Sequence, residues 1–98
     1  MPTYISLLNW TDQGIRRYKD TAERADAFAA GLERLGAKLV NLYWTVGPYD
    51  LVGVIEAPDE ETATAAILAT ASAGNIRSTT LRAFDKDEMG RIIAKSAD

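Results

Sequence analysis

The order of the hydrophobic patterns along this chain constrains its fold more than any other feature. A β-rich apolar run over 3–9 is followed by apolar residues at helical spacing, and then by two dense apolar runs over 37–46 and 50–57. A second helical pattern follows, and after it another β-rich run over 75–84. The sequence therefore predicts the order strand, helix, strand, strand, helix, strand.

The two predicted helices have start and stop signals. Asp20 and Glu23 have the spacing of a capping box before the first helix, and Asp59 precedes the second. Gly36 and Gly74 suit the position just past each helix end. The residues expected to face the core are Ala25, Phe28, Ala29, Leu32 and Leu35 in the first helix, and Ala63, Ala66, Ile67, Thr70 and Ala71 in the second.

Shorter signals complete the predicted architecture. A helical turn is expected over 15–19, and the turn residues at 47–49 predict a hairpin between the two middle strands. Asp85 and Glu88 again have capping-box spacing and start a C-terminal helix. The predicted fold class is α+β: one ferredoxin-like βαββαβ domain over 1–98, with a four-stranded antiparallel sheet and an extra C-terminal helix.

The composition excludes several classes of chemistry. The 98 residues fit one domain and contain neither cysteine nor histidine, so disulfides, thiolate or histidine catalysis and histidine-bound metals are excluded within one chain. A net charge of −3 argues against general nucleic-acid binding. We see no signal peptide and no apolar stretch of membrane-spanning length, so we expect a cytoplasmic protein without membrane contact.

The predicted sheet has too many apolar residues for a face open to solvent. Along the second strand, simple alternation places Leu39, Asn41, Tyr43 and Thr45 on one side and Val40, Leu42, Trp44 and Val46 on the other. Neither side is consistently polar, whereas an open antiparallel face is expected to be. A large exposed apolar patch usually contacts a partner, so we expect a homodimer or higher homo-oligomer.

Three blocks of the sequence resemble a known family. They are YISLLNWTDQGI over 4–15, YWTVGPYD over 43–50 and GNIRSTTLRAF over 74–84. Together they resemble the GYD domain family, whose name-giving residues correspond here to Gly47, Tyr49 and Asp50, with Pro48 between the first two. The resemblance implies a small bacterial domain related to dimeric α/β-barrel proteins, and it implies no particular activity.

The end of the first strand carries the first group of candidate ligand-binding residues. Asn9, Trp10, Thr11 and Gln13 offer amide, indole and hydroxyl groups that could orient a carbonyl or carboxylate. The alternative is a structural role in the loop, with Thr11 or Asp12 as a helix cap and Trp10 as a packing residue.

The predicted hairpin carries the second group. Tyr43, Trp44, Tyr49 and Asp50 combine aromatic surface with polar groups, as small-molecule clefts and dimer interfaces both do. In the structural alternative, Asp50 accepts a hydrogen bond from a turn amide and Gly47 has an unusual backbone angle.

The basic residues form the third group. Arg77 and Arg82 on the last strand could bind an anion, or could form salt bridges with Glu56 or Asp50. The remaining basic residues near the first helix alternate with acidic ones, and we expect a solvated surface there. They are Arg16, Arg17, Lys19 and Arg24.

Two functions remain open from the sequence. The first is a homo-oligomeric domain that binds a small organic ligand in a regulatory or carrier role, without turnover. The second is a cofactor-independent oxygenase like some dimeric α/β-barrel relatives, which would use Asn9, Trp10, Tyr43, Trp44 and Arg82. Neither requires a metal or cofactor, and none is predicted.

Overall fold

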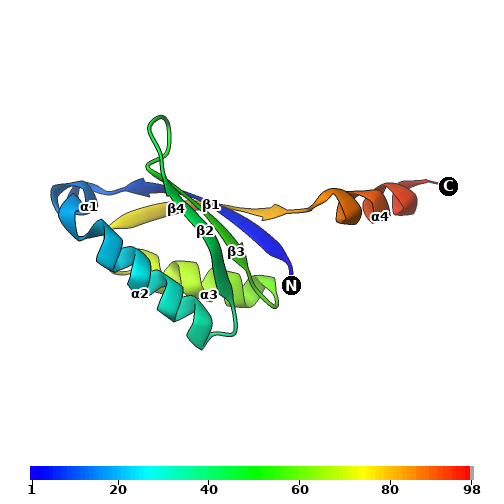
Figure 1. Ribbon diagram of the computed structural model, residues 1–98, viewed down its shortest axis with the longest axis horizontal. Helices are drawn as coiled ribbons and strands as arrows, with labels where there is room; N and C mark the ends of the chain where they lie inside the picture. The colour runs from blue at the N-terminus through cyan, green and yellow to red at the C-terminus, as the bar shows by residue number, and fades with distance from the viewer. Residues whose placement is uncertain (98) are drawn as a thin grey trace.

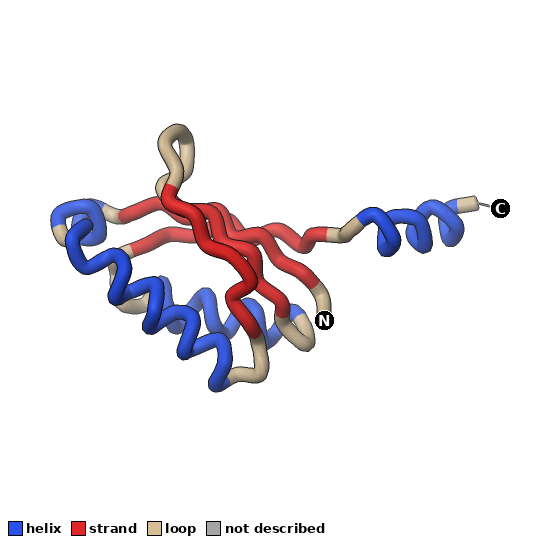
Figure 2. Tube along the Cα trace, viewed as in Figure 1, coloured by secondary structure: helices blue, strands red, loops and turns tan. Residues whose placement is uncertain are grey.

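The computed structural model describes residues 1–97 and has the predicted order of elements. They are β1 (Thr3–Trp10), α1 (Asp12–Arg16), a 3₁₀ turn (Tyr18–Asp20), α2 (Thr21–Arg34), β2 (Lys38–Trp44), β3 (Leu51–Glu56), α3 (Glu60–Ala71), β4 (Ile76–Ala83) and α4 (Lys86–Ser96). The strands pair antiparallel in the order β2-β3-β1-β4. Helices α2 and α3 lie on one face of this sheet (Figures 1 and 2), which confirms the ferredoxin-like α+β fold.

The core lies between the sheet and these two helices. Alternate residues of β1 and β3 are buried, including Tyr4, Leu8 and Ile55, because successive side chains of a strand point to opposite faces. Phe28 and Leu32 of α2 pack against them. Helix α3 contributes mainly small residues to this core, as the sequence predicted.

Two predicted caps are confirmed. The Asp59 carboxylate accepts a hydrogen bond from the Thr62 amide at 2.8 Å, and Asp85 with Glu88 forms a complete capping box. Gly36 and Gly74 both have positive φ angles, of 78° and 86°, just past the ends of α2 and α3.

The start of α2 differs from the prediction. Asp20 makes no capping hydrogen bond, because it belongs to the 3₁₀ turn and lacks the extended backbone that an N-cap residue needs. Its carboxylate instead pairs with Arg17 at 3.4 Å. The helical turn expected over 15–19 is instead α1, which begins at Asp12. It begins there because the Thr11 hydroxyl accepts a hydrogen bond from the Gly14 amide and caps the helix.

The alternation predicted for the second strand is wrong, because the pairing of β2 with β3 shifts register between Leu39 and Asn41. This irregularity leaves Val40 unpaired, as a β-bulge does. Leu39 and Leu42 therefore both pack against the core clusters, although they were predicted on opposite sides.

The face of the sheet that carries no helix is apolar at its centre. Ile5 pairs with Val54, and Leu7 pairs with Val52 across β1 and β3. Leu81 on β4 is 46% exposed beside Ile5. We call these five residues the open face.

Helix α4 projects away from the rest of the molecule (Figure 1). With this helix included, the chain measures 53 × 31 × 18 Å. The radius of gyration, 14.8 Å, exceeds the ~13 Å expected of a compact chain this long. Met89, Ile92 and Ile93 are exposed on this helix. Part of the apolar surface of this helix is therefore open to solvent.

Candidate functional site

Most of the candidate residues meet at the end of the sheet where β2 and β3 join. Asp50 connects this hairpin to β1 in two ways: its amide donates to the Leu8 carbonyl at 2.9 Å, and its carboxylate accepts from the Trp10 amide at 2.9 Å. The sequence predicted an acceptor role for Asp50. The donor, however, lies on a neighbouring strand and not in the turn.

Asn9 and Tyr49 also make contacts that hold the loop between the two strands. The Asn9 side-chain amide donates to the Pro48 carbonyl at 2.8 Å. The Tyr49 carbonyl accepts from the Thr45 hydroxyl at 2.6 Å, and Gly47 has the expected unusual φ, of 144°. The polar groups of this loop are therefore used largely within the chain.

The aromatic residues of the hairpin do not enclose a common cavity. Tyr43 is 57% exposed and lies opposite Val52, whereas the Trp44 indole donates to the Thr21 hydroxyl at 3.0 Å. Trp10 is half-buried and packs against Leu8 and its neighbours in the core. Trp44 thus connects β2 to the start of α2.

The two arginines of β4 lie at opposite ends of the strand. Arg77 is exposed and pairs with Asn9, whereas Arg82 pairs with Tyr4. Within residues 1–97, neither arginine forms the predicted ion pair with Glu56 or Asp50. Arg82 instead contacts Glu88 at 3.6 Å, because the start of α4 comes immediately after β4. The five residues considered for oxygenase chemistry therefore do not converge on one point.

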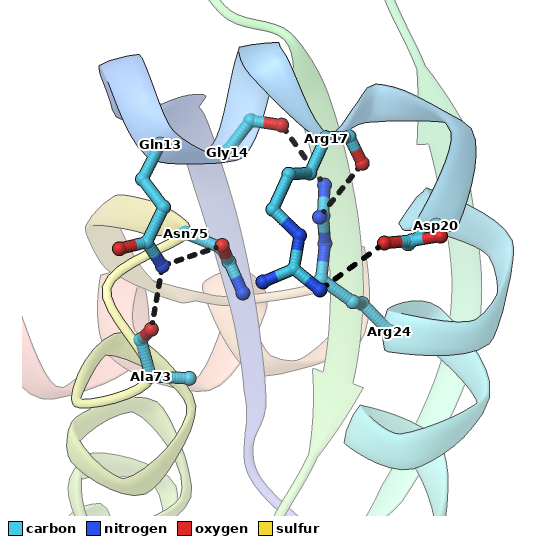
Figure 3. Close-up of polar contacts among 7 residues, drawn as sticks. All are labelled: Gln13, Gly14, Arg17, Asp20, Arg24, Ala73 and Asn75. Carbon is cyan, nitrogen blue, oxygen red and sulfur yellow. Dashed lines mark hydrogen bonds and ion pairs between the residues drawn. The ribbon is translucent and has the colours of Figure 1, made fainter.

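Helix α1 is fixed against the loop that connects α3 to β4. The Thr11 hydroxyl donates to the Gly74 carbonyl. The Gln13 side-chain amide donates to the Ala73 carbonyl at 3.0 Å and to Asn75 Oδ1 at 2.9 Å (Figure 3). A Cβ atom at Gly14 would lie 2.0 Å from the Asn75 carbonyl oxygen. Only glycine therefore permits this approach.

Arg24 is not part of a solvated surface, which corrects the sequence prediction. Its side chain is half-buried, and the guanidinium donates to the Arg17 carbonyl at 3.0 Å and the Gly14 carbonyl at 3.2 Å (Figure 3). Arg16, Arg17 and Lys19 are exposed as expected. Arg24 thus holds the C-terminal end of α1 against α2.

Tyr4 is the buried polar side chain that lacks a partner in the described chain. It is 4% exposed, and its hydroxyl has no hydrogen bond within residues 1–97. Burial raises the pKa of this phenol, nearby Glu60 raises it further, and Arg82 opposes the change. The hydroxyl is therefore neutral at physiological pH.

The sequence analysis missed a groove between α2 and α3, with a volume of about 470 Å³. Arg24, Asn75, Trp10 and Gly31 are among the residues that line it. Small residues on both helix faces are the available signal, but from the sequence we assign those of α3 to the core alone.

The described part of the chain contains neither a cluster of metal-ligating side chains nor a membrane-spanning helix. Residues 1–97 contain no group of three or more acidic side chains close enough to hold a metal ion. None of the helices among these residues combines the length and the apolar character that crossing a bilayer requires.

The architecture and the hairpin contacts define a small ferredoxin-like α+β domain with an extra C-terminal helix. The sequence model of the GYD domain matches residues 4–93. The chain therefore belongs to the GYD domain family, as the three sequence blocks suggested.

A relative from Thermus thermophilus is named glutamine synthetase and cystathionine beta-lyase binding protein. It is 40% identical over 85 residues, which are 86% of this chain and 90% of the relative. Among solved structures, TTHA0845 from the same species matches with a TM-score of 0.55 and 23% identity, over 87% of this chain and 95% of that one. MtbAldR matches with a TM-score of 0.59 and 13% identity, over 87% of this chain and 54% of that one. These two structures bear on the fold alone.

Proposed function

We propose that this protein is a non-catalytic binding protein that self-associates and regulates a metabolic enzyme by contacting it. The observation that carries the proposal is the 40% identity to a relative named for binding glutamine synthetase and cystathionine beta-lyase. The aligned region includes 86% of this chain and 90% of the relative, so the similarity extends over most of the domain.

The candidate polar residues support a binding role over a catalytic one. The Asn9 amide and the Asp50 carboxylate are both used in contacts that hold the hairpin to β1. These contacts engage one donor of Asn9 and one carboxylate oxygen of Asp50 in hydrogen bonds that hold the fold together. The structural contacts of Asn9 and Asp50 therefore support a binding role over a catalytic one.

The open face is the surface that we assign to self-association. Its central pairs, Ile5 with Val54 and Leu7 with Val52, are apolar across two adjacent strands, whereas an open antiparallel face is expected to be polar. A second copy offers an identical apolar face, and two such faces form a closed dimer.

Helix α4 is the surface that we assign to the enzyme. Met89, Ile92 and Ile93 have the spacing that places them on one side of a helix, and they are exposed because α4 projects from the body (Figure 1). Amphipathic helices with such anchors commonly bind a hydrophobic groove of a partner.

Self-association is tested by light scattering during size-exclusion chromatography over a series of concentrations. We expect a dimer or higher oligomer for the wild type and a monomer for Val54→Lys, because a central charge cannot be buried without a partner. Ala65→Lys adds the same charge on the exposed side of α3, and this variant should have the same number of subunits as the wild type. A wild-type monomer at every concentration would contradict this assignment.

Enzyme binding is tested by biolayer interferometry with the glutamine synthetase and the cystathionine beta-lyase of the source organism. We expect saturable binding to at least one of them, and a loss of affinity in Ile93→Asp. Ala94→Asp places the same charge on another side of α4 and should bind like the wild type. Absence of binding to both enzymes would remove the support for the proposed partner.

A further inference from the structure

The groove between α2 and α3 has a floor and walls of apolar side chains. Leu8, Leu42, Leu51 and Ile76 from the strands, together with Phe28 and Ala66 from the helices, are among the residues that line it. Its volume of about 470 Å³ lies within the range of small-molecule sites. A ligand in this groove would contact both helices and the sheet.

The groove stays open in part because several of the helix residues along it are small, although Phe28 and Arg24 of α2 also line it. Helix α3 contributes Ala66 and Ala69, the turn after α3 adds Ala73, and α2 contributes Gly31. A Cβ atom at Gly31 would find only Arg34 Nη2, at 3.6 Å, within 4 Å. Protein interiors usually fill such space with side chains, so its persistence here calls for an occupant.

One end of the groove carries a fixed positive charge. Arg24 lines it and is held by two backbone carbonyls, those of Gly14 and Arg17 (Figure 3). Within residues 1–97 no carboxylate forms an ion pair with this guanidinium. Its charge is therefore positioned beside the apolar groove without being neutralised.

Asn75 adds a polar donor at the same end. Its Oδ1 accepts from Gln13, which fixes the orientation of the side-chain amide, and its Nδ2 has no acceptor in the described chain. A guanidinium and an oriented amide together favour a carboxylate or a similar anion.

We propose that this groove binds a small apolar molecule that carries one anionic group. The apolar part lies between α2 and α3 over Leu8 and Leu51, and the anion lies against Arg24 and Asn75. This inference does not depend on the proposed contact between α4 and an enzyme, because the groove and α4 are separate surfaces.

The test uses two fluorescent probes of similar shape, anionic 8-anilinonaphthalene-1-sulfonate and neutral N-phenyl-1-naphthylamine. We expect saturable binding of one anionic probe per chain, at least about fivefold tighter than the neutral probe, because a charge-assisted hydrogen bond distinguishes them. Equal affinities for the two probes would overturn the assignment of an anion.

Gly31→Leu tests whether the probes bind in the groove. The leucine side chain fills the space between the helices, and leucine favours a helix more than glycine does, so the variant should fold. We expect this variant to lose the binding of both probes. Gly90→Leu adds the same side chain on α4, where nothing lies within 4 Å, and should bind like the wild type. Unchanged binding in Gly31→Leu would place the probes elsewhere, for example on the open face, and would overturn the proposal.

Arg24→Gln tests the charge. We expect the affinity for the anionic probe to fall at least about fivefold, with the neutral probe unchanged, and Arg24→Lys to retain part of the difference. Arg91→Gln removes an arginine from α4 and serves as the control. If Arg24→Gln does not fold, Arg34→Gln decides, because Arg34 also lines the groove. An unchanged preference for the anionic probe in that variant supports Arg24, and loss of the preference contradicts it. An equal loss of both probes in a folded Arg24→Gln variant would contradict the role of the charge.

Discussion

The amide of Trp10 donates to the carboxylate of Asp50 at 2.9 Å, and this contact joins the last residue of β1 to the hairpin between β2 and β3. The Asp50 amide meanwhile donates to the Leu8 carbonyl, so one residue binds β1 at two points. The aspartate after which the family is named thus fixes the register between distant parts of the chain.

Asp50→Ala should therefore destabilise the fold. The substitution leaves the Trp10 amide without its acceptor in a half-buried position, which typically costs about 1–3 kcal/mol. Urea denaturation followed by far-ultraviolet circular dichroism measures this change. Asp26→Ala removes an exposed carboxylate of α2 and should change the free energy of unfolding by less than about 0.5 kcal/mol. Equal stability of the two variants would contradict a structural role for Asp50.

The features that the sequence predicted well depend on neighbours in the chain. The caps at Asp59 and Asp85 each need an amide only three residues away, so the local sequence is enough to predict them. Asp20 has similar spacing, but the 3₁₀ turn that precedes α2 gives it the wrong backbone conformation. The bulge at Val40 also escaped prediction, because it depends on pairing with β3.

The candidate site was less predictable than the fold, because it depends on contacts between distant residues. Arg24 looked like one of several surface charges, and only the folded chain brings it to the carbonyls of Gly14 and Arg17. The groove beside it is likewise a property of the spacing between α2 and α3, which no local pattern encodes. The structure brings Asn9, Trp10 and Asp50 together beside the hairpin, whereas Arg82 lies opposite Tyr4 at the far end of the sheet.

Gly14→Ala should be strongly destabilising although the change adds one methyl group. The new Cβ would lie 2.0 Å from the Asn75 carbonyl oxygen, so α1 or the loop after α3 must shift. We expect a loss of at least about 2 kcal/mol in thermal or urea denaturation. Gly90→Ala is the matched control, because its Cβ meets nothing within 4 Å and alanine favours a helix, so its stability should stay equal or rise. Similar stabilities for both variants would show that the loop after α3 can move away from the new methyl group at little cost.

The cap at Asp59 predicts a specific dependence on pH. Hydrogen bonds from Thr62 lower the pKa of this carboxyl, so the ionised form stabilises the folded state. That contribution is complete above the unfolded pKa of about 3.9, and it is lost as the pH falls through the lower folded value. Melting temperatures between about pH 5 and pH 2 should therefore fall more for the wild type than for Asp59→Asn, which caps without titrating. Parallel curves for the two proteins would refute the prediction.

Tyr4→Phe should leave the fold as stable as before, or make it more stable. The Tyr4 hydroxyl is buried without a partner in the described chain, and an unsatisfied buried polar group costs about 1–3 kcal/mol. Phenylalanine keeps the ring in the core and its contact with the Arg82 guanidinium, which lies 5.6 Å from the ring centre. We expect the free energy of unfolding in urea to rise by up to about 1 kcal/mol. Tyr18→Phe removes a hydroxyl from a ring that is 53% exposed and should change little. A clear loss of stability in Tyr4→Phe, with Tyr18→Phe unchanged, would mean that the buried hydroxyl makes a stabilising hydrogen bond in solution.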